Sequence, residues 1–276
     1  MKINTNGIEI GYRIDGDDDD NSNKPWLVMS HSLACDGSMW DDQIDALASR
    51  FKILRFDTRG HGLSSAPPGP YTLDQLAEDV HGLFTALDIR HAHFVGLSMG
   101  GMIAQTFALK YPDVFHSMVL ADTTSSYAPD MATVWAARIE AAQRNGMPSL
   151  VEPTLVRWFT EPFRVEHPYT MQRIGAVIAS TPLAGYAGCS HAISKINVTR
   201  RLHEIRCPVL VIVGAEDQST PVAMAREIHE GIAGSKLEII PAAAHLSNIE
   251  QAERFNDVLT GFLTQVEHDA QAGTTR

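Results

Sequence analysis

The sequence predicts an α/β protein in which a mostly parallel central sheet is flanked by helices and interrupted by an inserted helical cap. In residues 1–122 and again in residues 205–266, short apolar runs typical of buried strands alternate with stretches that have helical patterns. Such alternation implies a parallel sheet that is covered on both faces. Residues 123–204 show helical patterns broken by prolines but no good strand, which indicates the cap. A length of 276 residues suits one large domain of this class with a lid.

The elements of the first half follow in the order that such a sheet requires. Residues 8–12 alternate between apolar and polar side chains, which indicates an edge strand. Thr72 and Gln75 have the spacing of a capping box, so a helix is expected to begin there and to continue through Leu87. The other expected strands are the apolar runs at residues 26–29, 51–56, 94–95 and 118–121.

The same alternation resumes after residue 205. Ser247 and Glu250 have the spacing of a second capping box, which predicts the start of the final helix. Residues 267–276 are expected to form a flexible tail. The expected elements are a strand at residues 208–214, a helix with Thr220 as N-cap and Pro221 as its first residue, a strand at residues 237–240, and the final helix through Phe262.

The motif Gly96-x-Ser98-x-Gly100 lies between an expected strand and a helix over residues 102–109. A serine can point into a cleft only from a very tight strand-to-helix turn, where side chains two residues to either side would collide. The helix that follows directs its N-terminal amides, and the positive end of its dipole, at the same point. We therefore interpret Ser98 as a catalytic nucleophile rather than as a chance serine in a glycine-rich turn.

A nucleophilic serine needs a histidine to take its proton and a carboxylate to orient that histidine. In an open parallel sheet these groups come from loops at the carboxyl ends of strands. Asp217 and His245 each follow an expected strand, and the chain order Ser98, Asp217, His245 is that of the α/β-hydrolase fold, with the cap inserted before the acid-bearing strand. Asp122 also ends a strand near the site. We favour Asp217 as the acid because the turn from Gly214 to Asp217 matches the usual acid loop.

Two convergent amides are needed to stabilise an oxyanion. One is expected to be the N–H of Met99, the residue after the nucleophile, and the other the N–H of Leu33, in the loop after the strand at residues 26–29. That loop begins with His31-Ser32, where many proteins of this fold have His-Gly. His31 and His61 both lie in loops near the site, and we expect each to organise its loop rather than to act as the base.

The composition argues against several classes of protein. A net charge of −11 at pH 7 disfavours a general affinity for nucleic acid or anionic membranes, and the acidic run at residues 17–20 is expected to be a solvated loop. Cys35, Cys189 and Cys207 are too few and too scattered for a disulfide framework or a zinc site. There is no apolar signal core at the N-terminus and no run of membrane-spanning length. We expect a cytoplasmic enzyme with free thiols and without a metal or organic cofactor, as a monomer or a homo-oligomer.

Several longer stretches, spread over nearly the whole chain, form a more specific pattern. They are His31-Ser32-Leu33, Gly37-Ser38-Met39-Trp40, the stretch from Arg55 to Gly62, the stretch from Gly96 to Met102, Trp135-Ala136-Ala137-Arg138-Ile139, Gly185-Tyr186-Ala187-Gly188-Cys189, and the stretch from Ala244 to Glu250. Together they resemble the 3-oxoadipate enol-lactonases, α/β-hydrolases of the protocatechuate branch of aromatic catabolism. The two cap motifs are the most specific, because caps usually diverge with substrate. The chain departs from the family at Ala34-Cys35, where Gly-Thr is usual, and at Ser190-His191.

The resemblance implies that the chain opens 3-oxoadipate enol-lactone to 3-oxoadipate through an acyl-enzyme on Ser98, with no cofactor. This lactone carries a free carboxylate, which a guanidinium can bind through two hydrogen bonds. The resemblance therefore implies a substrate-binding role for Arg138 and for its neighbour Trp135, with Arg157 and Arg164 further along the cap. The simpler interpretation of Arg138 is a solvated arginine on an amphipathic helix.

Other functions remain compatible with the same motifs. A carboxylesterase or lactonase of different substrate range is the nearest alternative, because fold and catalytic residues do not determine the acyl group. A cofactor-free haloperoxidase or perhydrolase is another alternative. A ligand-binding receptor on the same fold is the alternative that is not an enzyme.

Overall fold

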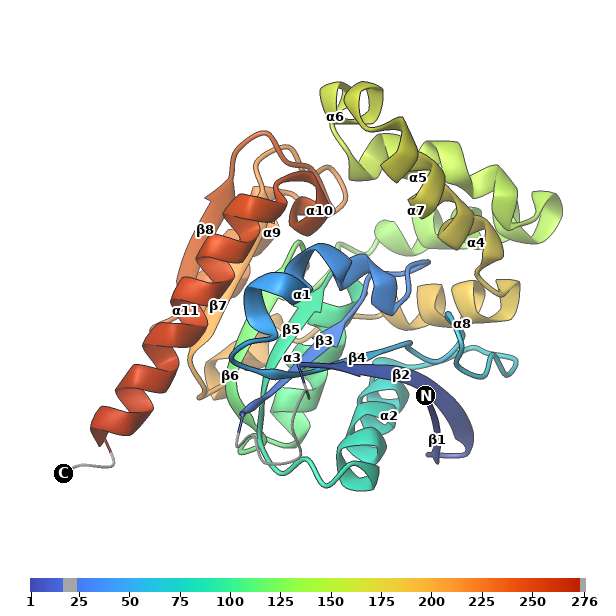
Figure 1. Cartoon of the computed structure of the whole chain (residues 1–276). Helices are drawn as coiled ribbons and strands as arrows, with labels where there is room; N and C mark the ends of the chain where they lie inside the picture. Colours follow the sequence, from blue (N-terminus) through green and yellow to red (C-terminus); the bar gives the residue numbers. More distant parts are fainter. Residues whose placement is uncertain (17–23, 274–276) are drawn as a thin grey trace.

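The computed structural model describes residues 1–16 and 24–273, so the acidic run at residues 17–20 lies outside the described residues. The described strands are β1 (Lys2–Thr5), β2 (Ile8–Asp15), β3 (Trp26–Ser30), β4 (Lys52–Phe56), β5 (Ala92–Leu97), β6 (Phe115–Ala121), β7 (Val209–Gly214) and β8 (Lys236–Ile240). They form one sheet in the order β1-β2-β4-β3-β5-β6-β7-β8 (Figure 1). β1 and β2 pair in antiparallel fashion at one edge, and the pairs from β4 to β8 are parallel. The prediction of a mostly parallel sheet is confirmed.

Helices cover both faces of this sheet. α1 and α11 pack against each other, and α2 packs against α3. The core helices are α1 (Asp41–Leu47), α2 (Leu73–Ala86), α3 (Met99–Lys110), α9 (Val222–Gly231), α10 (Ser247–Glu250) and α11 (Ala252–Gly273). All residues of β5 and β7 are buried, as expected for central strands of a parallel sheet with helices on both faces.

Thr72 of the first predicted capping box is the N-cap of its helix, whereas the second predicted capping box does not form. Thr72 accepts a hydrogen bond from the N–H of Gln75 at 3.1 Å, at the start of α2. Ser247 instead donates its hydroxyl proton to Asp122, and Glu250 accepts hydrogen bonds from the N–H groups of Ala244 and Thr160. The spacing of Ser247 and Glu250 is thus used for tertiary contacts, so the prediction of a capping box there was wrong.

Three further elements differ from the sequence-based expectation. β1 was not predicted, because its alternation is short and mostly polar, and it forms by pairing with β2. Helix α9 begins at Val222 with Pro221 as its N-cap, because the side chain of Thr220 is bonded to Asp217. The final helix is split into α10 and α11, and α11 continues through Gly273, into the segment for which we predicted a flexible tail.

The inserted segment is helical, as predicted. Its helices are α4 (Met131–Asn145), α5 (Val151–Trp158), α6 (Glu161–Glu166), α7 (Pro168–Ser180) and α8 (Leu183–Ile193), and α4 to α7 lie together beyond one end of the sheet (Figure 1). The two ends of the segment meet, since Ser126 and Asn197 form an isolated β-bridge and the N–H of Val198 donates to the carbonyl of Ser125 at 2.8 Å. We therefore propose residues 123–204 as one structural unit, the cap.

Two glycines of α8 allow the cap to contact the core closely. A Cβ on Gly185 would lie 1.9 Å from the carbonyl oxygen of Gly60, and a Cβ on Gly188 would lie 2.6 Å from the ring of Tyr71. The N–H of Tyr71 also donates to the carbonyl of Gly188 at 3.2 Å. Any larger residue at Gly185 would push α8 away from the core, which gives the Gly185–Cys189 motif a physical reason.

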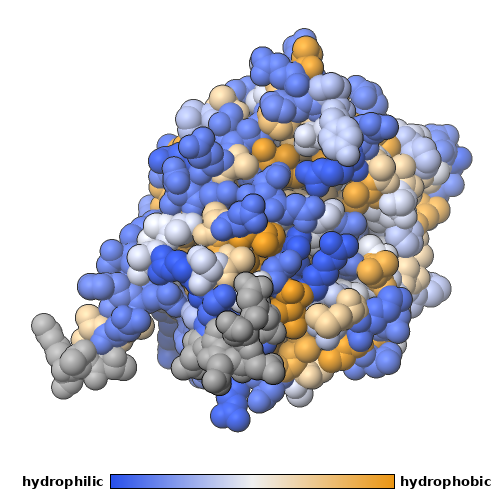
Figure 2. Space-filling view, in the orientation of Figure 1, coloured by the Kyte–Doolittle hydropathy of each residue, from blue (hydrophilic) through white to orange (hydrophobic). Residues whose placement is uncertain are grey.

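The face shown in Figure 2 is mostly hydrophilic, with apolar groups in patches between polar ones. The exposed large hydrophobic residues include Leu63 on the core and Val165 and Tyr169 on the cap. Of the helices that the structure describes, none is long and apolar enough to cross a membrane.

Candidate active site

Ser98 lies at the sharp turn between β5 and α3, in a strained backbone conformation. Its φ is 54° and its ψ is −112°, and a residue in such a sparsely populated region costs about 1–3 kcal/mol. Contacts on both sides hold it there. Its N–H donates to the carbonyl of Ala121 at 2.9 Å, and its carbonyl accepts from the hydroxyl of Thr123 at 2.7 Å. The strain is therefore concentrated at the residue that the sequence predicted to be the nucleophile.

The glycines of the motif are required by close backbone contacts. A Cβ on Gly96 would lie 2.3 Å from the carbonyl oxygen of Gly100, and a Cβ on Gly100 would lie 2.1 Å from that of Ser30. Neither position can hold a side chain without moving β3 or α3. This agrees with the prediction that glycine is needed on both sides of Ser98.

Ser98, His245 and Asp217 form a hydrogen-bonded chain. The Oγ of Ser98 is 3.0 Å from Nε2 of His245, and Nδ1 of His245 is 2.8 Å from Oδ2 of Asp217. The arrangement fits the tautomer in which Nδ1–H donates to the carboxylate and Nε2 accepts from the serine hydroxyl. The structure thus brings together the three residues that we predicted to be catalytic, from loops that lie far apart in the sequence.

Asp217 is held in an environment that favours its charged form. It accepts hydrogen bonds from the N–H of Ser219 at 2.7 Å, from the N–H of Thr220 at 3.0 Å and from the hydroxyl of Thr220 at 2.7 Å. Burial by itself raises its pKa, but the charge of His245 and these hydrogen bonds hold the pKa of Asp217 below its ordinary value. An ionised Asp217 can orient the imidazole and stabilise the imidazolium that forms when His245 accepts a proton.

Asp122, the alternative acid, makes different contacts. Its carboxyl accepts hydrogen bonds from the N–H of Gly214 at 2.8 Å and from the hydroxyl of Ser247 at 2.5 Å. Burial raises the pKa of Asp122 well above its usual range, and the nearby charge of Asp217 raises it further. Asp217, and not Asp122, is the carboxylate hydrogen-bonded to His245. Asp122 instead connects the strand before Asp217 to the helix after His245.

The backbone N–H groups of Leu33 and Met99 are the expected donors to an oxyanion at Ser98. Leu33 lines the same cavity as Ser98, and Met99 is the first residue of α3, where N–H groups have no partner within the helix. Neither amide donates a hydrogen bond to another described residue. Both amides are therefore free of protein acceptors among the described residues, and their role toward an oxyanion stays a prediction.

Two buried histidines support the loop that contains Leu33. Nε2 of His31 accepts from the N–H of Thr58 at 2.9 Å while its Nδ1 donates to the carbonyl of Ser32 at 2.7 Å. Nε2 of His61 accepts from the N–H of Ala34 at 3.0 Å. Burial lowers the pKa of both rings, and the pKa of His61, which is also next to His31, falls to about 3. Both are thus neutral acceptors that organise the loop.

The depressed pKa of His61 predicts a loss of stability in acid. The unfolded chain binds a proton on this ring near pH 6.5 and the native protein only near pH 3, so the stabilisation is fully present above pH 6.5 and falls between these values. The free energy of unfolding should drop by about 2–3 kcal/mol from pH 7 to about pH 4.5 through this group. Urea unfolding at the two pH values measures it. In His61→Gln, whose amide oxygen can still accept from Ala34 but does not titrate, this part of the pH dependence should vanish; an unchanged pH dependence would contradict the assignment.

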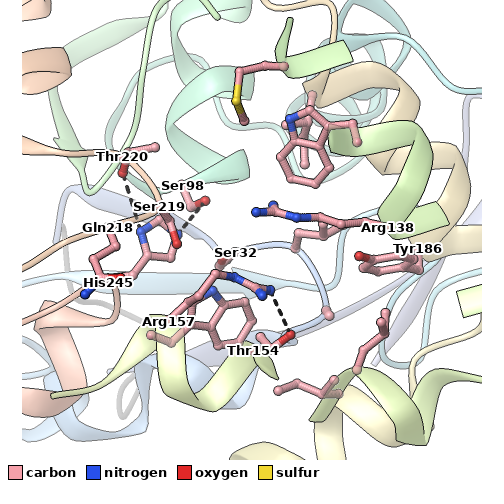
Figure 3. Close-up of a pocket in the computed structure, with 18 of the residues that line it drawn as sticks. Ser32, Ser98, Arg138, Thr154, Arg157, Tyr186, Gln218, Ser219, Thr220 and His245 are labelled. Carbon is pink, nitrogen blue, oxygen red and sulfur yellow. Dashed lines mark hydrogen bonds between the residues drawn. The ribbon is translucent and has the colours of Figure 1, made fainter. Parts of the chain in front are cut away.

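A cavity between core and cap lies over Ser98 (Figure 3). From α4 it is lined by Trp135 and Arg138, the two residues that the resemblance implied. The guanidinium carbon of Arg138 lies 4.8 Å from the centre of the Trp135 ring, and Figure 3 shows the guanidinium pointing into the cavity. Arg138 is therefore a pocket residue and not a solvated arginine on the outside of the cap.

The cavity also contains residues to which the sequence analysis assigned no role. Arg164 is not among the lining residues, because its guanidinium donates to backbone carbonyls of Val156 and Phe159. The signal for one lining residue was present in the Gly185–Cys189 motif, whereas the others lie on cap helices without a distinctive pattern. Arg157, which the sequence analysis named as a further cap arginine, lines the cavity, and the unassigned lining residues include Tyr127, Trp158 and Tyr186.

The chain is similar to known α/β hydrolases over most of its length. A family model described as alpha/beta hydrolase fold matches residues 25–252. Two proteins of Acinetobacter baylyi named 3-oxoadipate enol-lactonase are similar to the chain. One is 37% identical over 85% of this chain and 87% of its own length, and the other is 35% identical over 97% of both. The crystal structure of the enol-lactonase from Burkholderia xenovorans LB400 superposes with a TM-score of 0.92 and 39% identity, covering 96% of this chain and 100% of that one.

Proposed function

Because the chain belongs to the 3-oxoadipate enol-lactonase family of α/β hydrolases, we propose that it hydrolyses 3-oxoadipate enol-lactone to 3-oxoadipate by a serine mechanism. The hydrogen-bonded chain of Asp217, His245 and Ser98, which opens into a cavity with a cationic cap side, carries this proposal. Such a chain is the arrangement that makes a serine hydroxyl nucleophilic.

In the first step, His245 takes the proton of Ser98 as its Oγ attacks the lactone carbonyl. The oxygen of the tetrahedral intermediate receives hydrogen bonds from the amides of Met99 and Leu33. The ring C–O bond then breaks, and the electron pair leaves with the ring oxygen as an enol, which is a better leaving group than an ordinary alkoxide. The protonated His245 returns its proton to that oxygen.

In the second step, His245 activates a water molecule that attacks the acyl-enzyme and releases Ser98. The enol product can tautomerise to the ketone, which draws the reaction forward. Asp217 supports both steps, because it stabilises the imidazolium each time His245 carries the extra proton.

The free carboxylate of the lactone is proposed to bind Arg138, while the indole of Trp135 packs against the ring. Two observations support these roles: both side chains line the cavity above Ser98, and the guanidinium of Arg138 points into it (Figure 3). A guanidinium binds a carboxylate through two parallel hydrogen bonds, so it orients the lactone as well as attracting it.

Steady-state hydrolysis of 3-oxoadipate enol-lactone, beside a neutral short-chain ester of similar reactivity, tests the substrate. We expect kcat/KM for the lactone to be higher by about tenfold or more, because a bound charge-assisted pair contributes about 1.5–3 kcal/mol. Arg138→Ala should remove most of this preference and leave the neutral ester nearly unchanged. Arg144→Ala, on the solvent side of the same helix and ion-paired with Glu140, is the matched control.

Equal kcat/KM values for the two substrates would contradict 3-oxoadipate enol-lactone as the substrate and favour an esterase of different substrate range. Equal losses for both substrates in Arg138→Ala would instead remove the carboxylate-binding role and leave the hydrolase assignment standing. If Ser98 were acylated slowly in a single turnover and no steady-state hydrolysis followed, the result would favour a ligand-binding receptor.

A further inference from the structure

A second guanidinium enters the cavity from another cap helix. Arg157 on α5 lines the same cavity as Arg138, and Figure 3 shows the two side chains reaching toward the middle of the cavity from different cap helices. One nitrogen of Arg157 donates to the hydroxyl of Thr154 at 3.2 Å. Within residues 1–16 and 24–273, neither Arg138 nor Arg157 forms an ion pair with a carboxylate.

The other arginines that are buried in this protein are compensated. Arg59 pairs with the buried Asp79 at 2.6 Å, and Arg55 pairs with both Asp15 and Asp41. A half-buried guanidinium without a counterion is costly, and a second one nearby adds repulsion. Burial lowers the pKa of Arg157, and the charge of Arg138 lowers it further. Two cations in one cavity therefore indicate a ligand that carries two negatively charged oxygen groups.

The proposed lactone carries only one negative charge, but its ring opening creates a second. The ring oxygen and the carboxylate are attached to the same short unit, O–C–CH2–COO⁻, so a lactone whose carboxylate is bound at the cap also has its leaving oxygen near the cap. When the acyl C–O bond breaks, the electron pair moves to that oxygen and gives an enolate beside the carboxylate. The enolate is then neutralised by the proton of His245.

Building on the proposed function, we propose that Arg157 binds the negative charge that ring opening places on the leaving oxygen, while Arg138 binds the carboxylate that the substrate already carries. The cap thus presents a site for two anionic oxygen groups whose oxygen-bearing carbons are separated by one CH2. An interaction that strengthens only as the ring opens lowers the barrier of the chemical step, whereas one made equally in the ground state lowers KM.

Steady-state kinetics should distinguish the roles of Arg157 and Arg138, because one is expected to affect kcat and the other KM. Arg157→Gln should lower kcat by about tenfold or more with little change in KM, because it removes a contact that develops during ring opening. Arg138→Gln should mainly raise KM. Arg157→Lys keeps the charge and should recover part of kcat. If Arg157→Gln raises KM and leaves kcat unchanged, or if Lys rescues nothing, Arg157 has no role toward the leaving oxygen.

Binding of malonate tests the site without any turnover, because its two oxygen-bearing carbons are separated by one CH2, as they are in the opened lactone. Isothermal titration calorimetry near pH 8 should show malonate binding at least about tenfold more tightly than monomethyl malonate. Arg157→Gln should abolish that difference, and Arg144→Gln, the exposed control on α4, should preserve it.

Equal binding of the two probes to the wild-type protein, or an unchanged difference in Arg157→Gln, would overturn the site for two anionic groups. These outcomes are independent of the proposed function. Lactone hydrolysis without a malonate preference would overturn only the role of Arg157, and a malonate preference that depends on Arg157 without lactone hydrolysis would overturn only the named substrate.

Discussion

Ser98→Ala is expected to lower kcat for lactone hydrolysis by about 10⁴- to 10⁶-fold, because it removes the atom that attacks the carbonyl. The remaining rate would come from binding and from the amides of Met99 and Leu33. The substitution removes one oxygen, whose hydrogen bond is to His245, so the fold should be retained. Steady-state hydrolysis, with circular dichroism to confirm folding, measures the effect.

Ser194→Ala is the matched control for this prediction. Ser194 lies just after α8, and its hydroxyl donates to the carbonyl of His191. Its replacement should leave kcat within about twofold, since surface substitutions usually have small effects. A folded Ser98→Ala variant that retained more than a tenth of wild-type activity would rule out the acyl-enzyme mechanism.

Asp217→Asn is expected to lower kcat by about 10⁴-fold while leaving the geometry intact. An amide at this position can donate to Nδ1 of His245, which favours the tautomer with the proton on Nε2. That tautomer cannot accept the proton of Ser98. The loss should therefore appear in kcat for every ester or lactone, and not in substrate preference.

Asp122→Asn discriminates between the two candidate acids. Asparagine at residue 122 can still accept from the N–H of Gly214 and can donate to the hydroxyl of Ser247, so it keeps partners for both side-chain atoms. Because the pKa of Asp122 is raised by burial and by the charge of Asp217, replacing its carboxyl with a neutral amide should change kcat by less than about tenfold. If Asp122→Asn lowered kcat as much as Asp217→Asn does, Asp122 would have to share the role of the acid.

In the proposed mechanism, the cap determines which substrates the catalytic residues act on. A chain of Asp217, His245 and Ser98 is compatible with many acyl groups, whereas Arg138 and Arg157 add two positive charges to the lining of the cavity. The close packing of Gly185 against Gly60 fixes α8 on the core, and Tyr186 of the same helix lines the cavity with both arginines. The unit that is proposed to recognise substrate charge is therefore packed closely against the core.

Local patterns predicted the elements whose causes are local. The glycines around Ser98 revealed the tight turn, because a Cβ on either would collide with nearby backbone. Thr72 and Gln75 revealed the start of α2 for a similar reason, since an N-cap depends only on residues within one turn. The apolar run of β7 predicted a central strand, because a strand covered on both faces needs apolar residues throughout.

The errors arose where a side chain was used by a distant segment. Ser247 and Glu250 have capping-box spacing, but neither caps a helix. The hydroxyl of Ser247 donates to Asp122. The carboxylate of Glu250 accepts from the N–H groups of Ala244 and Thr160. Thr220 was predicted as an N-cap and is instead bonded to Asp217. Sequence spacing shows which contacts are possible within a helix, and it does not show which partner offers the stronger hydrogen bond.

The sequence by itself determined the fold class, the nucleophile turn and the order Ser98, Asp217, His245, because these follow from periodicity and from short motifs with strict steric needs. Only the tertiary structure decided which carboxylate contacts His245 and which cap arginines enter the cavity. Arg138, Arg157 and Arg164 all lie on cap helices. Arg138 and Arg157 line the cavity, whereas Arg164 donates to the carbonyl of Phe159. The direction of a side chain on a cap helix depends on how that helix packs on the core, and no local pattern records that packing.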